Sequence, residues 1–122
     1  MNNLICVLED CENLTVIPTL LLGEHYQVAS AGTIAEFSNI LPGLTPARFL
    51  IDIILPDGNG LSVCQHIKTD LSTAHVPVLI MSANFQVEKI QEWTYADDCI
   101  AKPFDIDDLQ NRITKLTKPK DN

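Results

Sequence analysis

The strongest strand signal in the chain is the stretch FLIDIIL, residues 49–55, which is closed by Pro56. A short apolar run that stops at turn residues is typical of a strand buried on both faces of a parallel sheet. Asp52 is the one charged residue in this run. An ionised carboxylate among apolar neighbours is costly unless it is paired or bound to a metal. The stretch therefore predicts a buried strand and singles out Asp52 as a candidate functional residue.

Shorter apolar runs on either side of this stretch predict further strands. We expect them at residues 4–8, 26–30, 76–82 and 98–101. The segments between the strands are longer and mixed, and we expect helices at residues 12–22, 33–40, 61–69, 86–94 and 105–116. Pro18 should kink the first of these helices or delay its start. Strands that alternate with helices predict an α/β fold, a five-stranded parallel sheet with helices on both faces.

The final helix has the clearest pattern. Four apolar residues at helical spacing line one of its faces: Ile106, Leu109, Ile113 and Leu116. Asp105 can cap the start of this helix, and Arg112 and Lys115 complement the partial negative charge at its end. We therefore expect the helix to pack on the sheet through its apolar face.

The size and composition of the chain predict one globular domain. Of 122 residues, 46% are apolar and 20% are charged, which is enough apolar material for one hydrophobic core. We expect a single domain over residues 1–122, with its core at about 4–116 and a tail or the start of a linker at 117–122. The four cysteines are expected to be free thiols, several of them buried. A zinc site is not expected, because no Cys-x-x-Cys motif and no paired histidines occur.

The charge balance is acidic, with 16 acidic against 8 basic residues and a formal net charge of −8. Nucleic acids and anionic membranes are bound through clustered Lys and Arg, so we expect this domain to contact neither. No apolar run approaches the ~20 residues of a membrane span. The first residues also lack the basic and apolar pattern of a signal peptide. We therefore expect a cytoplasmic protein.

Polar residues follow, end or interrupt four of the expected strands: Glu9, Asp10, Asp52, Ser82 and Lys102. In open α/β sheets the ligand site lies at the carboxyl ends of the strands, so these side chains are expected to meet there. Two carboxylates ~5 Å apart repel by roughly 3 kcal/mol at an effective dielectric of 20. Three acids therefore need more positive charge than one lysine provides. A hard, oxygen-ligated cation such as Mg²⁺ fits this need.

These residue types suit phosphoryl transfer to a carboxylate. A carboxylate oxygen of Asp52 can attack phosphorus and form an acyl phosphate. Mg²⁺ and Lys102 would offset charge on the phosphoryl oxygens, and Ser82 would donate a hydrogen bond to one of them. The hypothesis from the residues alone is that Asp52 is transiently phosphorylated.

Four motifs, in order and on expected strands, carry a family resemblance. They are VLED at 7–10, LIDIILPDGNGL at 50–61, VPVLIMSA at 76–83 and AKPF at 101–104. Together they make the sequence resemble, from Leu4 to about Leu116, the receiver domain of two-component response regulators. The resemblance implies a flavodoxin-like fold with strand order 2-1-3-4-5. It also implies that the domain phosphorylates and dephosphorylates itself and is not a turnover enzyme.

The resemblance assigns a role to each residue of the site. Asp52 is the implied phosphoacceptor, Ser82 the hydroxyl that closes on the phosphoryl group, and Lys102 the cation that binds it. The implied ligands of Mg²⁺ or Mn²⁺ are the carboxylates of Asp10 and Asp52, the backbone carbonyl of Ile54 and, through water, Glu9. The implied donor is a phosphohistidine on a sensor histidine kinase or a histidine phosphotransfer protein. The other implied partners are an output domain, an effector protein, or a second copy of the chain in a homodimer.

The chain departs from the family pattern at several positions. Cys99 stands where the family usually has an aromatic switch residue, and Tyr95 stands where it usually has Gly. Ile54 and Asn84 occupy positions that tune the lifetime of the phosphoryl group in the family. An apolar side chain at position 54 cannot orient an attacking water, so we expect slow self-dephosphorylation.

Three other interpretations compete with this one. A haloacid-dehalogenase-like phosphatase would need an Asp where this chain has Ile54. A flavodoxin would need a phosphate-binding loop after the first strand, where Glu9, Asp10 and Glu12 would repel a phosphate. The strongest alternative is a pseudo-receiver, an interaction module that is not regulated by phosphorylation. Such modules usually lack one of the acids or the lysine, and this chain has them all.

Overall fold

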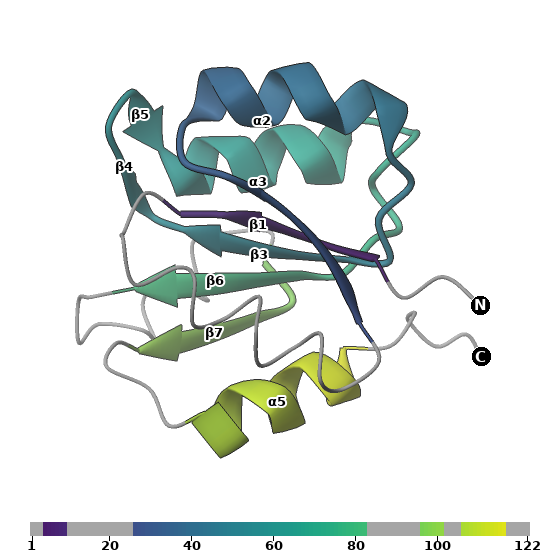
Figure 1. Ribbon diagram of the computed structural model, residues 1–122, viewed down its shortest axis with the longest axis vertical. Coiled ribbons are helices and arrows are strands. Elements are labelled where there is room, and N and C mark those ends of the chain that lie inside the picture. The colour runs from purple at the N-terminus through teal and green to yellow at the C-terminus, as the bar shows by residue number, and fades with distance from the viewer. Residues whose placement is uncertain (1–3, 10–25, 83–95, 102–105, 117–122) are drawn as a thin grey trace.

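The computed structural model describes residues 4–9, 26–82, 96–101 and 106–116. Within these ranges one sheet runs through the molecule, and all its strands are parallel. Its strands are β1 (Leu4–Leu8), β2 (Gln27–Ala31), β3 (Arg48–Asp52), β6 (Val78–Ser82) and β7 (Asp98–Ala101). The strand order across the sheet is β2-β1-β3-β6-β7 (Figure 1). Counted along the chain, this is the expected order 2-1-3-4-5, and the predicted fold class is confirmed.

Helices cover both faces of this sheet, as the sequence predicted. Helices α2 (Ile34–Ile40) and α3 (Gly60–Thr69) lie on one face, and α5 (Ile106–Lys115) lies on the other (Figure 1). A short 3-10 helix, η2 (Leu41–Gly43), follows α2. The helices expected at 12–22 and 86–94, together with the expected cap at Asp105, lie outside the described residues.

Alternation along the strands divides the core into two layers. Phe49 and Ile51 of β3 belong to a buried cluster that also contains side chains of α2 and α3. Leu50, between them, belongs to a second cluster with Leu109 and Ile113 of α5. Successive residues of a strand point to opposite faces, so a continuous apolar run fills both layers at once. The expected packing of the last helix through its apolar face is confirmed at these two positions.

The third strand ends earlier than the sequence predicted. We expected a strand over residues 49–55, but β3 stops at Asp52. Residues Ile54–Leu55 form a separate strand, β4, which pairs antiparallel with β5 (Gly58–Asn59) in a small hairpin. The N–H of Gly60 donates to the carbonyl of Ile53 at 2.6 Å. Ile53 is therefore bonded to the first residue of α3, where a longer strand would be bonded to a neighbouring strand. The chain therefore leaves the sheet directly after Asp52.

Arg112 of α5 does more than complement the end of its helix. Its Nη1 donates to both carboxylate oxygens of Asp98, at 2.9 and 3.0 Å, and to the carbonyl oxygen of Cys99 at 3.0 Å. Its Nε donates to Asp108 one turn earlier, at 3.2 Å. Arg112 therefore fastens α5 to the start of β7, a contact that the sequence pattern did not predict.

Candidate functional site

Asp52 ends the central strand of the sheet, and 7% of its surface is exposed. It pairs in register with Met81 of β6, and the next residue, Ile53, donates its N–H to the carbonyl of Met81 at 3.2 Å. The residue is therefore held at the carboxyl edge of the sheet, between β1 and β6. This is where ligands bind in open α/β sheets.

Glu9 lies beside Asp52 at the same edge. It directly follows β1, whose last residue, Leu8, pairs with Ile51 of β3. Its N–H donates to the carbonyl of Ala31 at 3.0 Å, which keeps this backbone aligned with β2. By the alternation of the strands, Glu9 and Asp52 share the sheet face that is covered by α5. Only 4% of Glu9 is exposed, so two acids are buried at neighbouring positions.

Ser82 ends the next strand, β6, and is 1% exposed. It pairs in register with Ala101, the last residue of β7 and the residue before Lys102. The structure thus brings Glu9, Asp52 and Ser82 to one edge of the sheet. Asp10 and Lys102 lie outside the described residues, so their places in the site stay predictions.

Gly60 allows α3 to begin directly against the end of β3. A Cβ atom at this position would overlap the backbone carbonyl oxygen of Asp52 and come within 2.8 Å of its carbonyl carbon. It would also lie 3.0 Å from Cγ2 of Ile51. The absence of a side chain at position 60 is therefore what lets the hairpin fold back over the end of the strand.

The hairpin β4–β5 presents Ile54 to solvent, with 72% of this apolar residue exposed. Its neighbour Leu55 is buried in the cluster beneath α2 and α3. The side chain of Ile54 is therefore not held by packing, and the backbone of the hairpin sets its position. This backbone includes the carbonyl that we expected to ligate a metal.

Asp57, at the turn of the hairpin, makes a contact that sequence reasoning missed. Its Oδ1 accepts from the N–H of Ile34 at 2.8 Å, and its Oδ2 accepts from the N–H of Ala35 at 3.0 Å. These two hydrogen bonds lower the pKa of the Asp57 carboxyl from its usual value of 3.8. The partners are 22 and 23 residues away in the sequence, so the local pattern Pro-Asp-Gly indicated a turn and nothing more.

The donors at this edge suit a hard divalent cation. Carboxylate and carbonyl oxygens are the ligands that Mg²⁺ takes, and a cation between two buried acids at neighbouring positions would offset their mutual repulsion. Among the described residues no group of three His, Cys, Asp or Glu side chains gathers, and the third expected acid, Asp10, is outside them. The oxygen donors among the described residues are of the type that such an ion binds.

The cysteines play no part in this site as described. Cys6, Cys64 and Cys99 are free and buried, as the sequence predicted for several of the four. Burial raises the pKa of each of these thiols to about 11. A thiol with so high a pKa stays protonated and poorly reactive, which argues against a redox role for Cys99. Cys11 lies outside the described residues.

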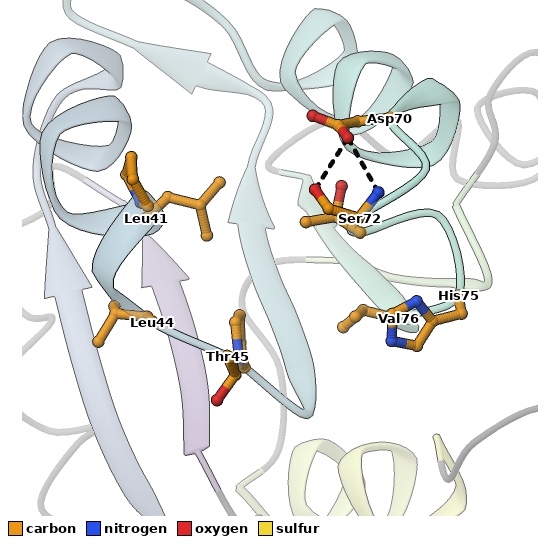
Figure 2. A pocket seen from close by; sticks show the side chains of 10 residues that line it. Leu41, Leu44, Thr45, Asp70, Ser72, His75 and Val76 are labelled. Atoms are coloured by element: carbon orange, nitrogen blue, oxygen red, sulfur yellow. Dashed lines mark hydrogen bonds between the residues drawn. The ribbon is translucent and has the colours of Figure 1, made fainter.

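A cavity of about 530 Å³ opens at the opposite edge of the sheet (Figure 2). It lies between residues 41–46, which precede β3, and residues 70–76, which precede β6. Leu41, Leu44 and Val76 contribute apolar surface, and Asp70 accepts from the N–H and the hydroxyl of Ser72 at 2.9 and 2.8 Å. The amino-terminal ends of the strands surround this cavity, so it is separate from the site at Asp52.

A family model for the response regulator receiver domain matches residues 4–114, nearly the whole described chain. The chain belongs to the receiver domain family of response regulators. The match includes the edge at which Glu9, Asp52 and Ser82 lie. No helix among the described residues of this receiver domain is long and apolar enough to cross a membrane.

Individual relatives agree with the family. The response regulator PleD of Caulobacter vibrioides is 31% identical over 127 residues, which cover 98% of this receiver domain and 27% of PleD. The response regulator ArlR of Staphylococcus saprophyticus is 34% identical over 123 residues, which cover 93% of this chain and 52% of ArlR. The chain thus spans about half or less of the length of these curated relatives.

A solved structure with the same fold is the receiver domain of the sensor histidine kinase PA1611 from Pseudomonas aeruginosa. It aligns with a TM-score of 0.83 at 24% sequence identity and covers 95% of this chain and 98% of that one. In that structure a magnesium ion is coordinated in the active-site cleft. The likeness shows that the two chains share the same fold.

Proposed function

We propose that this chain is a single receiver domain, over residues 1–122, that accepts a phosphoryl group on Asp52. The observation that carries the proposal is the buried pair Glu9 and Asp52 at the carboxyl edge of the sheet, with Ser82 at the end of the next strand. Two buried acids at neighbouring positions repel each other, and a bound divalent cation would offset that cost.

The proposed metal is Mg²⁺ or Mn²⁺. The carboxylates of Asp10 and Asp52 and the backbone carbonyl of Ile54 would hold it directly, and Glu9 would hold it through water. When bound, the metal would neutralise charge on the phosphoryl oxygens. Magnesium in the cleft of the PA1611 receiver domain supports the choice of metal.

The proposed reaction transfers a phosphoryl group from nitrogen to oxygen. A carboxylate oxygen of Asp52 attacks phosphorus, a P–O bond forms, and the P–N bond to the donor imidazole breaks with its electron pair remaining on nitrogen. Lys102 would bind one phosphoryl oxygen, and the Ser82 hydroxyl would donate a hydrogen bond to another. The phosphoryl group adds about −1.5 to −2 charges and strong acceptor oxygens at this edge, to which the Ser82 hydroxyl would move to donate its hydrogen bond.

The proposed donor is a sensor histidine kinase or a histidine phosphotransfer protein, and the proposed location is the cytoplasm. The output would pass to a linked domain, an effector protein or a second copy of the chain. In this role the domain catalyses only its own phosphorylation and dephosphorylation. The alternative is a pseudo-receiver that signals by binding alone, and the two differ in whether Asp52 is ever phosphorylated.

Phosphorylation by a small donor tests the proposal. We expect the purified chain, incubated with Mg²⁺ and acetyl phosphate, to gain one phosphoryl group in its intact mass. Hydroxylamine should remove the group, because acyl phosphates react with this nucleophile, and a chelator should prevent the gain. An active receiver domain labelled in parallel serves as the positive control. If only that control gains mass, the pseudo-receiver is the correct function.

The phosphoryl group on this receiver domain is expected to be long-lived. Ile54 is apolar and points to solvent, so it provides no hydrogen bond that could orient a water for attack on phosphorus. After removal of the donor, the labelled mass should decay over minutes to hours in Mg²⁺. A half-life of seconds without any phosphatase would contradict this. The variant Ile54→Asn, which adds a polar amide at an exposed position, is expected to decay faster.

A further inference from the structure

We propose that Asp57 is a positioning residue for the metal site: it ties the β4–β5 hairpin to the N-terminus of α2 and thereby raises the affinity for the divalent cation. The inference rests on the function proposed above, since it concerns the same site. It goes further, because Asp57 is not among the proposed ligands of the metal or of the phosphoryl group. It acts through the backbone that carries the carbonyl of Ile54.

The base of the hairpin is held on both sides by backbone hydrogen bonds. The N–H of Ile53 donates to Met81 of β6 at 3.2 Å, and the carbonyl of Ile53 accepts from Gly60 at 2.6 Å. Leu55 adds an apolar anchor in the core. Ile54, between these anchors, is exposed and makes no such packing contact. On the side away from the sheet, the position of the hairpin is therefore set by its turn and by the contacts that the turn makes.

Asp57 supplies that contact. Its two carboxylate oxygens accept separately from the N–H groups of Ile34 and Ala35, at 2.8 and 3.0 Å. Both distances are normal for N–H···O hydrogen bonds, and the charge of the acceptor strengthens them. A negative charge at a helix N-terminus is also stabilised by the helix dipole. The turn of the hairpin is thus fixed to α2 by a two-point contact, which restricts both its distance and its orientation.

Other residues also cap the start of α2, so the role of Asp57 can be tested separately from helix capping. The hydroxyl of Thr33 accepts from the N–H of Glu36 at 3.0 Å, and the carboxylate of Glu36 accepts from the N–H of Gly32 at 3.0 Å. Thr33 therefore stabilises the same end of α2 through hydrogen bonds within the helix and not to the hairpin. Loss of Thr33 weakens the helix start alone, whereas loss of Asp57 also releases the hairpin.

The coupling between Asp57 and the site works in both directions. If the contact raises the affinity for Mg²⁺ by some factor, then bound Mg²⁺ must strengthen the contact by the same factor. Partners that orient metal ligands typically change affinity by about 10–100-fold. Asp57 is exposed and acts on the proposed ligand only through the backbone of the hairpin. We therefore expect its removal to weaken Mg²⁺ binding by a smaller factor, about 3–10-fold.

The experiment is a titration of the whole chain with MgCl₂ at constant ionic strength, followed by the backbone amide resonances of Asp52 and Ile53. Wild type, Asp57→Ala and Thr33→Ala are compared. We expect Asp57→Ala to bind Mg²⁺ about 3–10-fold more weakly and Thr33→Ala to bind it as wild type does. Saturating Mg²⁺ should also slow hydrogen exchange at the amides of Ile34 and Ala35 in wild type, and not in Asp57→Ala.

Two results would overturn the inference while leaving the proposed function standing. One is equal Mg²⁺ affinity in wild type and Asp57→Ala. The other is an equal loss in Thr33→Ala, which would mean that general weakening of α2 causes the effect. If wild type itself shows no saturable binding of Mg²⁺, the proposed metal site fails and the inference fails with it. Circular dichroism of both variants checks that they are folded.

Discussion

Asp52→Asn is expected to gain no phosphoryl group under conditions that label the wild type fully. The substitution keeps the shape of the side chain but removes the carboxylate that attacks phosphorus. Intact mass after incubation with Mg²⁺ and acetyl phosphate measures the effect. Asp70→Asn is the matched control, because Asp70 lies at the opposite edge of the sheet and is bound by Ser72. Equal labelling of Asp52→Asn and wild type would mean that a different residue is the acceptor.

The same variant should be more stable than the wild type when no divalent cation is present. Glu9 and Asp52 are buried at neighbouring positions, so a neutral amide at position 52 relieves their mutual repulsion. For two charges ~5 Å apart this repulsion is roughly 3 kcal/mol at an effective dielectric of 20. After allowing for the polar group that Asn keeps buried, we expect a gain of about 1–2 kcal/mol in the free energy of unfolding. Thermal unfolding in a chelator measures this. A destabilised Asp52→Asn would argue against mutual repulsion at the site.

Gly60→Ala is expected to destabilise the protein by about 3 kcal/mol, a large effect for one methyl group. The added Cβ would overlap the carbonyl oxygen of Asp52 and crowd Ile51, and the obstruction is mostly backbone that cannot rotate away. Either α3 or the end of β3 must shift to make room. For a domain of this size the midpoint of thermal unfolding should fall by roughly 10 °C.

Gly43→Ala is the control for the chemistry of the substitution. A Cβ at Gly43 meets nothing within 4 Å, so this variant carries the same change without the clash. It should be neutral or slightly stabilising, because Ala restricts the unfolded chain more than Gly does. The interpretation of Gly60 would be wrong if Gly60→Ala unfolded at the same temperature as the wild type.

Much of the fold could be predicted because its signals are local. A run such as residues 49–55 is typical of a strand buried on both faces, and its alternation with amphipathic segments implies a parallel sheet. Asp52 stands out for the same reason, because a charge within an apolar run is recognised from its immediate neighbours. The strand order followed from the resemblance of four ordered motifs to one family, and the structure confirms it.

The hairpin after Asp52 shows what local sequence signals could not predict. Ile54 and Leu55 continue the apolar run, yet Leu55 is buried and Ile54 is 72% exposed. Nothing in the run distinguishes these two residues. The strand ends because α3 begins at Gly60 and its first N–H binds Ile53, an event that depends on packing seven residues further along the chain.

Local sequence signals were enough for the α/β class, the central strand and the acidic edge, because hydrophobic periodicity and an isolated charge act over a few neighbouring residues. They also predicted Asp10 and Lys102, whose places in the site stay predictions. The partners of Asp57 and Arg112, in contrast, emerge only from the packed fold. Each of these charged groups binds atoms on another element, 22 and 23 residues away for Asp57 and 13 and 14 for Arg112. Such contacts exist only once the elements have packed, because their energy depends on distances that no local pattern encodes.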